Sequence, residues 1–559
     1  MRFWFWFSLF VVAVYGYFGL EFAFRDNYIV DSDARQHVFW MQRFLDPELF
    51  PNDWIADYHE FVAPAGYSSL YWIAAKLGIP PLFFNKILPP ILGLITTAFC
   101  FKTSLYLFPY PAAAFTSSVL LNQILWTKYD IISGTARAFI YPLFLAFLYF
   151  LLRRSLLGTT LTIALTAVFY PQSTLVCSGV LILLLLRWDN RRLQLNPNRQ
   201  DLKIIITGVS VAFVILLTYL LRSPEFGPAI SAEVARQSPE FLPDGRTPFF
   251  HDNPWEFWLY GNRSGILPKP WLPPIAWLGL LLPWLMRHPS RFVLLEKVRD
   301  GIGMLPRIAI ASLGMFAIAH LFLFRLHLPS RYTMHSLRIV LSLSAGIAIL
   351  ALLEAGLHAS LTQSRPWQRS LAIGGAFLWG IWMIFYPLTP EEFPYHKYKE
   401  GEEEAIYEFL QQQPKDTLIA SISEKANYLP TFAKRLVLTS EMYAIAYHVG
   451  YYNKIRQRTL DIVRAQYSPQ LDPAVNLIRE YGVNYWLLDR VAFTPPYLSH
   501  YDWLMQYEET RDALQRLQQG IVPALSTTVE RCTILASEEA LLLDANCIAE
   551  MGERQIANP

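Results

Sequence analysis

The chain alternates between long runs of apolar residues and shorter polar segments. Runs of about 17 to 25 apolar residues are long enough to cross a bilayer as helices. Such runs lie near residues 3–22, 83–107, 111–129, 138–152, 203–221, 271–286, 307–326, 336–357 and 370–388. The stretch 157–187 exceeds that length, and Pro171 inside it stops helix propagation, so it predicts two short helices. The pattern therefore predicts a polytopic α-helical membrane protein with about eleven spans.

Two apolar segments need a separate interpretation. The first run is expected to be a retained anchor helix rather than a signal peptide, because no small-x-small cleavage site follows its apolar part. The segment 65–79 is short, and we expect it to form a helix at the membrane interface. If 65–79 crossed the membrane instead, every later loop would change sides and the charge pattern described next would fail.

The charges between the spans predict which side each loop faces. Basic residues with few accompanying acids concentrate in the segments 153–157, 187–203, 287–307 and 358–369. Cytoplasmic loops carry an excess of Lys and Arg, so these segments and the N-terminus are expected in the cytoplasm. The outer segments are then 23–82, 130–137, 222–270, 327–335 and the tail after about residue 389. We therefore expect a multi-pass protein of the inner or plasma membrane.

The tail differs in kind from the rest, because charge returns and short apolar segments alternate with helical ones. Buried strands are predicted at 417–421, 435–440 and 483–489. Helices are predicted over 402–413 and 501–519. About 170 residues are enough for a separate hydrophobic core. We expect a membrane domain over 1–388, with long outer loops 23–82 and 222–270, and an extracytoplasmic α/β domain over 389–559.

Composition agrees with a membrane protein. Hydrophobic residues make up 53% of the chain, and charged residues only 16%, against about 25% in an average soluble protein. The net charge of +2 and the absence of a basic stripe give no indication of nucleic-acid binding. Cys100 and Cys177 fall in apolar spans, whereas Cys532 and Cys547 fall in the outer tail, in what resembles a pair of strands. In an oxidising compartment the latter two are candidates for a disulfide.

The segment DSDARQH (31–37) places two carboxylates, an Arg and a His just outside the first span. Asp31 and Asp33 are suited to binding a divalent cation such as Mg²⁺ or Mn²⁺, or to general-base catalysis with one orienting the other. Alternatively, Asp33 caps a helix over the following residues ARQHVFWMQRFL. His37 lies four residues after Asp33, on the same face of that helix, where it either assists or forms a structural hydrogen bond.

Basic residues gather at two other outer positions. Arg137, in SGTARAFIYP, either binds a phosphate bidentately or extends to the interface. The segment 325–338 brings together Arg325, His327, Arg331, Tyr332, His335 and Arg338 at the junction of two spans. Ionisable residues at membrane depth are costly and are therefore functional candidates. Arg331 beside Tyr332 suits a lipid-linked phosphate.

Two further outer segments carry candidate chemistry. Asp53, Asp57, His59 and Glu60 have a spacing that permits a metal site, but a polar loop on lipid headgroups is the simpler interpretation. The loop 222–270 is rich in Pro, Gly and aromatic residues. Long loops without regular structure are usually functional, and aromatic side chains suit sugar rings.

The arrangement resembles the GT-C superfamily of membrane glycosyltransferases. DSDARQH stands where that family has its acidic motif, SRYT (330–333) resembles its late basic element, and NYLPTFAKRLVLTSE and REYGVNYWLLD are similar to segments of bacterial members. The resemblance implies a polyprenyl-phosphate-linked sugar as donor. It implies Asp33 or Asp31 as the catalytic carboxylate and Arg331 as the phosphate contact. No WWD-like motif is present, so the resemblance does not imply protein N-glycosylation.

The expected reaction is an inverting transfer of a sugar from the membrane-borne donor to an extracytoplasmic glycan, lipid or protein acceptor. Asp33 would take the proton of the acceptor hydroxyl, and Arg331 with Arg137 would neutralise the leaving phosphate. Two alternatives remain. One is a transporter or flippase for lipid-linked sugars, although mid-span charges are scarce apart from Glu354. The other is a non-catalytic scaffold whose C-terminal domain binds glycans.

Overall fold

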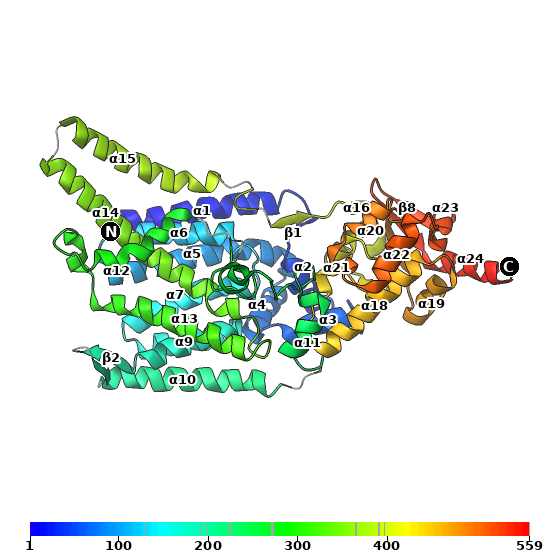
Figure 1. Cartoon of the computed structure of the whole chain (residues 1–559), viewed down its shortest axis with the longest axis horizontal. Coiled ribbons are helices and arrows are strands. Elements are labelled where there is room, and N and C mark those ends of the chain that lie inside the picture. Colours follow the sequence, from blue (N-terminus) through cyan, green and yellow to red (C-terminus); the bar gives the residue numbers. More distant parts are fainter. Residues whose placement is uncertain are drawn as a thin grey trace.

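The computed structural model describes residues 1–128, 130–189, 192–196, 198–222, 225–269, 273–363, 366–389, 392–395 and 397–557. Parts of the predicted inner segments 187–203 and 358–369, and the start of the predicted span 271–286, lie outside these ranges. A long helical part occupies one side of the molecule, and the C-terminal residues form a smaller part at one end of it (Figure 1). The N-terminus lies at the opposite end of the helical part.

The helical part contains a helix at each predicted span. These helices are α1 (Arg2–Ala23), α5 (Pro81–Leu107), α6 (Pro111–Thr127), α7 (Ile140–Leu152), α8 (Leu156–Phe169), α9 (Pro171–Leu183), α10 (Arg199–Leu220), η5 (Pro274–Leu281) with α12 (Leu282–Leu285), α13 (Met304–Leu321), α14 (Met334–Gln363) and α15 (Pro366–Phe385). The predicted break at Pro171 is confirmed, because α8 ends at Phe169 and Pro171 opens α9. Proline fits the first turn of a helix, where no N–H donor is needed.

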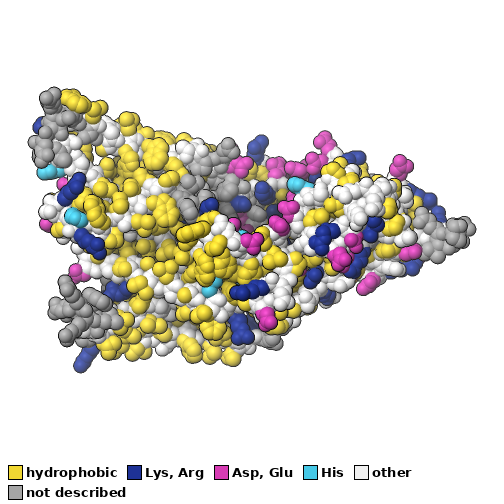
Figure 2. All heavy atoms as spheres, viewed as in Figure 1, with side chains coloured by type: hydrophobic (Ala, Val, Ile, Leu, Met, Phe, Trp, Pro, Cys, Tyr) yellow, Lys and Arg dark blue, Asp and Glu magenta, His cyan; other side chains and the backbone are white. Residues whose placement is uncertain are grey.

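Six helices in the described part are long and apolar enough to cross a membrane by length and composition. Four shorter apolar helices accompany them, so the total of about eleven spans stays a prediction. Apolar side chains cover much of the surface of the helical part, while charged side chains gather around the C-terminal part (Figure 2). A lipid-facing surface next to a water-facing one produces this distribution. The chain is a membrane protein.

The first outer segment folds against the C-terminal part. It contains β1 (Ile29–Asp31), α2 (Ala34–His37), η1 (Phe39–Phe44), α3 (Trp54–Val62) and α4 (Ala65–Lys76). Strand β1 pairs antiparallel with β4 (Tyr398–Glu400), so that Asp31 lies opposite Tyr398. The polar loop expected around residue 57 is instead the helix α3, whose first turn is capped by the Asp53 carboxylate. The helix expected at 65–79 is α4.

The C-terminal part is built on a five-stranded sheet in the order β6-β5-β7-β9-β8. The predicted strands are confirmed as β5 (Leu418–Ala420), β6 (Leu436–Val437) and β7 (Tyr485–Asp489), and these three are parallel. The strands β8 (Thr533–Ala536) and β9 (Ala540–Asp544) are antiparallel neighbours. A disulfide joins Cys532 and Cys547, whose Cα atoms are 5.5 Å apart.

Helices cover this sheet. They include α16 (Glu404–Gln411), η10 (Glu424–Tyr428), α17 (Leu429–Phe432), α18 (Val449–Tyr467), α19 (Asp472–Tyr481), α20 (Pro495–Ser499), α21 (Asp502–Met505), α22 (Glu508–Gln518), α23 (Val529–Cys532) and α24 (Ala545–Ala557). The predicted helix 402–413 is confirmed as α16, whereas 501–519 divides into α21 and α22. Helix α19 ends at Tyr481 and is capped by Gly482, which has a φ of +70° that glycine adopts without strain.

The long outer loop also contacts the C-terminal part. It contains α11 (Ala232–Gln237) and the π-helical turn η4 (Glu256–Tyr260). Gly227 approaches Gly450 at the start of α18 so closely that a Cβ on Gly227 would lie 2.6 Å from the Gly450 nitrogen. Arg246 donates to the Glu441 carbonyl at 2.6 Å. The two outer loops and the C-terminal part therefore meet in one region, which contains the candidate site.

Candidate active site

The DSDARQH turn is organised by Asp31. Its Oδ1 accepts the backbone N–H groups of Asp33 (2.9 Å) and Ala34 (3.3 Å), and its side chain is fully buried. Asp33 occupies the N-cap position of α2, but its carboxylate makes no capping bond in the structure. The expectation that Asp33 caps the helix is therefore corrected, because Asp31 makes the local bonds and the Asp33 carboxylate is directed elsewhere.

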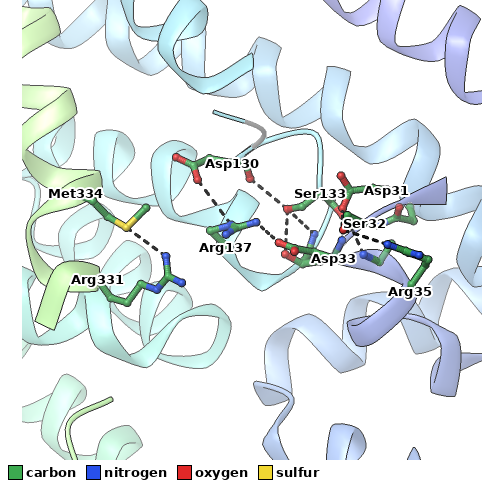
Figure 3. Close-up of polar contacts among 12 residues, drawn as sticks. Asp31, Ser32, Asp33, Arg35, Asp130, Ser133, Arg137, Arg331 and Met334 are labelled. Carbon is green, nitrogen blue, oxygen red and sulfur yellow. Dashed lines mark hydrogen bonds and ion pairs between the residues drawn. The ribbon is translucent and has the colours of Figure 1, made fainter. Parts of the chain in front are cut away.

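The Asp33 carboxylate pairs with Arg137, which precedes α7 in the second outer segment (Figure 3). The Arg137 Nε lies 3.7 Å from Oδ1 of Asp130, so one guanidinium lies between two carboxylates. The Asp33 side chain is 31% exposed, whereas that of Asp130 is only 2% exposed. Of these two carboxylates, only that of Asp33 is therefore within reach of a ligand.

Asp130 is a site residue that sequence reasoning missed. Its Oδ2 accepts hydrogen bonds from Arg338 and from the Tyr141 hydroxyl, the latter at 2.6 Å. The same hydroxyl lies 2.9 Å from Nδ1 of His335. A sequence signal was available, because Asp130 follows a predicted span directly, as Asp31 and Asp33 do. Buried charges persist when they are paired, and Asp130 joins α14 to Arg137 in this way.

A cavity of about 790 Å³ lies beside Asp33 and Arg137 and is lined by both outer loops and the C-terminal part. Most of the charged side chains that line it are positive. Asp33 is the one acidic side chain among the described lining residues, against five arginines: Arg137, Arg222, Arg246, Arg263 and Arg331. Arginine forms planar, multiple hydrogen bonds to phosphate oxygens. The cavity is therefore suited to an anionic ligand close to one carboxylate.

Three of the arginines have no carboxylate partner among the residues that the structure describes. Arg331 donates to the Met334 sulfur at 3.2 Å, a weak acceptor (Figure 3). Arg263 donates to the Tyr447 hydroxyl at 3.1 Å, and Arg222 lies over the ring of Phe61. Their positive charge is not neutralised locally, which favours an anion in the cavity.

The charges set the protonation states around Asp33. Burial alone would raise the pKa of Asp33, but Arg137, His37, Arg331 and Lys397 outweigh it and hold that pKa below its usual value. Burial and the neighbouring Asp33 charge raise the pKa of Asp31 to about 7. Burial also lowers the pKa of His37. At neutral pH the site therefore presents an ionised Asp33 beside a neutral His37.

Several buried polar atoms at the cavity wall have no hydrogen-bond partner in the described structure. They are Gln36 Nε2 and both ring nitrogens of His59. His59 is 1% exposed, and burial lowers its pKa well below the usual value. Buried polar groups are normally satisfied, so orphaned groups at a cavity wall indicate a polar ligand. Neutral donors and acceptors of this kind suit sugar hydroxyls.

The structure separates the predicted site residues into two groups. Asp33, His37, Arg137 and Arg331 line the cavity, and His327 joins them. Asp31 does not line it, and its Oδ1 holds the backbone of the turn, so its catalytic role stays a prediction. Tyr332 does not line the cavity either: its ring is 1% exposed and its hydroxyl donates to the Leu326 carbonyl at 2.7 Å, so its ligand contact stays a prediction.

The residues present do not fit the expected divalent cation. Within the described ranges, no three His, Cys, Asp or Glu side chains lie together as ligands would. Asp33 is engaged by the Arg137 guanidinium, and the Asp31 side chain is buried behind the turn. Hard divalent cations need several oxygen ligands. The reaction is therefore described through the side chains of this chain alone.

Comparison with known proteins supports the fold. No family model and no curated protein sequence matches the chain. The solved oligosaccharyltransferase AglB of Archaeoglobus fulgidus superposes with a TM-score of 0.50 at 10% identity, over 90% of this chain and 71% of that one. ArnT from Cupriavidus metallidurans covers 98% of both chains with a TM-score of 0.45 at 12% identity. The arabinofuranosyltransferase AftD from Mycobacteria has a TM-score of 0.48 at 14% identity, over 88% of this chain and 37% of that one.

The AglB structure is that of a GT-C glycosyltransferase, and the chain has its fold. The resemblance expected from the sequence is thus confirmed at the level of the fold. One AglB structure is described as a complex with an inhibitory peptide and a dolichol-phosphate. At 10% identity the likeness concerns architecture, so activity has to be argued from the site.

Proposed function

We propose that the protein is an inverting glycosyltransferase that moves a sugar from a polyprenyl-phosphate donor to an extracytoplasmic glycan, lipid or protein acceptor. The observation that carries the proposal is the cavity in which five arginines face a single reachable carboxylate, Asp33. The arginines supply the charge for a phosphate leaving group, and Asp33 supplies the base. The N-terminus would be cytoplasmic, and the cavity and the C-terminal part extracytoplasmic.

In this mechanism the acceptor hydroxyl oxygen attacks the anomeric carbon from the side opposite the phosphate. A new carbon–oxygen bond forms, and the bond from the anomeric carbon to the phosphate oxygen breaks with its electron pair. The hydroxyl proton passes to the Asp33 carboxylate. Because the pKa of Asp33 is low, this transfer becomes favourable late, once the attacking oxygen has bonded and its proton has become acidic.

The arginines stabilise the leaving group. Arg331 and Arg263 have no carboxylate partner in the described structure, so a phosphate entering the cavity does not have to displace one. Arg137 already pairs with Asp33 and holds it in place. Fixed donors at the position where charge develops typically contribute a factor of about 10² to 10³ each.

The orphaned polar atoms support a sugar next to the phosphate. Gln36 and His59 come from the same outer segment as Asp33 and line the same cavity. A site built to hydrogen-bond hydroxyls discriminates strongly against ligands that lack them. The sugar ring is accordingly expected between the arginines and the α2–α3 segment.

Binding of a phosphate-bearing lipid tests the proposal directly. Polyprenyl phosphate and the uncharged polyprenol are titrated into the purified chain in detergent, with Arg331→Gln and the exposed neighbour Arg325→Gln as a matched pair. The proposal predicts preference for the phosphate and a loss of about tenfold or more in affinity for Arg331→Gln alone. Equal binding of both lipids, or equal effects of both variants, would contradict it.

A further inference from the structure

The long outer loop contacts the C-terminal part through its backbone at one end and through a buried carboxylate further along. At the first place, Ala229 forms an isolated β-bridge with His448, and Tyr451 donates its backbone N–H to the Phe226 carbonyl at 2.9 Å. The second place is the 3₁₀ turn η3 (Pro239–Phe241), which follows α11. In Figure 1, α11 lies beside α18, the helix that makes contacts at both places.

The buried carboxylate is that of Glu240, which is 1% exposed. Its Oε1 accepts hydrogen bonds from the hydroxyls of Tyr452 (2.9 Å) and Tyr507 (3.1 Å). Arg456 Nε lies 3.7 Å from the same oxygen, but its side chain is 44% exposed and lies over the Tyr507 ring. Tyr452 belongs to α18, and Tyr507 is the N-cap residue of α22. One carboxylate oxygen therefore joins the loop to two helices of the C-terminal part.

The backbone of Glu240 closes a turn that reaches the cavity of the candidate active site. Its carbonyl accepts hydrogen bonds from the backbone N–H (2.9 Å) and the hydroxyl (3.1 Å) of Thr247. We call residues 240–250 the Glu240 turn. Arg246 and Thr247 of this turn line the cavity. Glu240 therefore connects the C-terminal part, through its side chain, with the cavity wall, through its backbone.

The direction of the Arg246 side chain depends on the position of this turn. Its Nε donates to the Glu441 carbonyl at 2.6 Å, and its Nη2 donates to the Met442 carbonyl at 3.4 Å. Met442 also lines the cavity. Both bonds require the Glu240 turn to lie within hydrogen-bond range of residues 441–442, because such bonds weaken steeply when distance or angle changes.

The burial of Glu240 favours a positional role over a contribution to stability. Removing a carboxylate from water costs several kcal/mol, and well-packed apolar residues at a buried ionic position are often at least as stabilising. Directional hydrogen bonds from two hydroxyls add something that apolar packing does not, since they are satisfied at only one position of the loop. A buried carboxylate at this contact therefore restricts the Glu240 turn to a single position.

We infer that Glu240 is a positioning residue for the cavity of the candidate active site. By holding the Glu240 turn on α18 and α22, it places Arg246 and Thr247 at the cavity wall. The inference rests on the proposed function for the identity of the ligand, a phosphate-bearing lipid, whereas the placement of the turn does not depend on it. It gives the C-terminal part a share in ligand binding.

Amide hydrogen exchange of the full chain in detergent tests the placement without any ligand. In Glu240→Ala, the amides of Thr247 and Phe249, whose hydrogen bonds close the turn, should exchange about tenfold faster or more, while β5 and β7 keep wild-type protection. Glu240→Gln keeps an oxygen that accepts both hydroxyls and should restore most of the protection. Unchanged exchange in the turn, or faster exchange that extends equally to β5 and β7, would overturn the inference.

A second set of variants reaches the same contact from the C-terminal part. Tyr452→Phe combined with Tyr507→Phe keeps both rings and removes the two hydroxyls, so it should raise exchange at the same amides. Adding Glu240→Ala to this pair should have little further effect. Glu233→Ala, an exposed acid on α11 that does not line the cavity, is the matched control. Additive effects, or an equal effect of Glu233→Ala, would overturn the inference.

Titration with polyprenyl phosphate then connects the turn with the ligand. Glu240→Ala should lower the affinity about tenfold, and Glu240→Gln should recover most of it. In the Arg246→Gln background, Glu240→Ala should change the affinity little further, because both changes remove the same contact. Wild-type affinity in Glu240→Ala would overturn the inference. A wild-type chain that binds polyprenyl phosphate no better than polyprenol would instead contradict the proposed function, and the exchange result would still decide the placement of the turn.

Discussion

Arg137 forms an ion pair with Asp33 across 104 residues of sequence and so joins the first two outer segments at the cavity wall. The pair does two things for the proposed reaction. It keeps Asp33 ionised at neutral pH, and it fixes the carboxylate beside arginines that have no acidic partner. A phosphate and a hydroxyl can therefore be held on either side of one reaction centre.

Removal of the Arg137 charge should change the pH dependence of transfer. Burial raises the pKa of Asp33, and Arg137 is the largest opposing influence. In Arg137→Gln the pKa of Asp33 should rise, so the acid limb of kcat/KM against pH should move to higher pH. Arg137→Lys keeps the charge and should move it less. An acid limb that is identical in wild type and Arg137→Gln would show that Asp33 is not the titrating group.

The pair between Asp130 and Arg338 should matter for stability more than for chemistry. Both side chains are at most 4% exposed, so Asp130→Asn leaves Arg338 buried without its carboxylate. Breaking a buried pair costs about 3 to 5 kcal/mol. Thermal unfolding in detergent should show a marked loss for Asp130→Asn. The double variant Asp130→Asn with Arg338→Met should lose less than the two single losses added together, and strict additivity would contradict the coupling.

The Asp31 carboxyl should make the stability of the folded protein depend on pH. Its pKa is about 7 in the folded protein and about 3.9 in an unfolded chain. Between these values the folded state holds a proton that the unfolded state releases, so this residue lowers stability as pH rises through that window. Asp31→Asn keeps the oxygen that accepts the two backbone N–H groups and does not titrate. The melting temperature of Asp31→Asn relative to wild type should therefore rise from pH 4 to pH 8, and a constant difference would contradict the assignment.

His59 should contribute to substrate binding. Both of its ring nitrogens are buried at the cavity wall without partners in the described structure. His59→Phe should raise KM about tenfold or more, because the bond to a ligand hydroxyl is lost, whereas His59→Gln should recover part of it. Glu60→Gln, on the same helix but paired with Arg43, is the matched control. Equal KM values for all three variants would remove His59 from the site.

Much of the fold follows from the sequence, because a bilayer demands long apolar helices and a soluble core demands short apolar strands. The break at Pro171 and the strands β5, β6 and β7 were predictable for that reason. The helix over residues 53–62 was not predictable, because the buried face of α3 is formed by packing against η1 and not by an apolar run. The predicted helix 501–519 instead divides at residues 506–507, between α21 and α22, and the structure gives no local reason for the break.

Residues of the candidate site were predictable only where a charged residue lies next to the end of an apolar span. Asp33, His37, Arg137 and Arg331 carry that signal and line the cavity. Arg246 and Arg263 come from the middle of the long loop, and Tyr447 from the C-terminal part, so no local pattern distinguishes them. Their place depends on contacts between segments about 200 residues apart, such as that of Arg246 with Glu441.

The central claim is that Asp33 is the base of a sugar transfer, and one comparison tests it most directly. A deletion strain is complemented with wild type, Asp33→Asn or Asp31→Asn, and its lipid-linked sugars and surface glycans are measured by mass spectrometry. In Asp33→Asn, transfer should fall about 10² to 10⁴-fold, so that an unused polyprenyl-phosphate sugar accumulates and one glycan loses a residue, while Asp31→Asn stays close to wild type. Unchanged glycans with a well-expressed Asp33→Asn protein would contradict the account and favour a transporter or a glycan-binding scaffold.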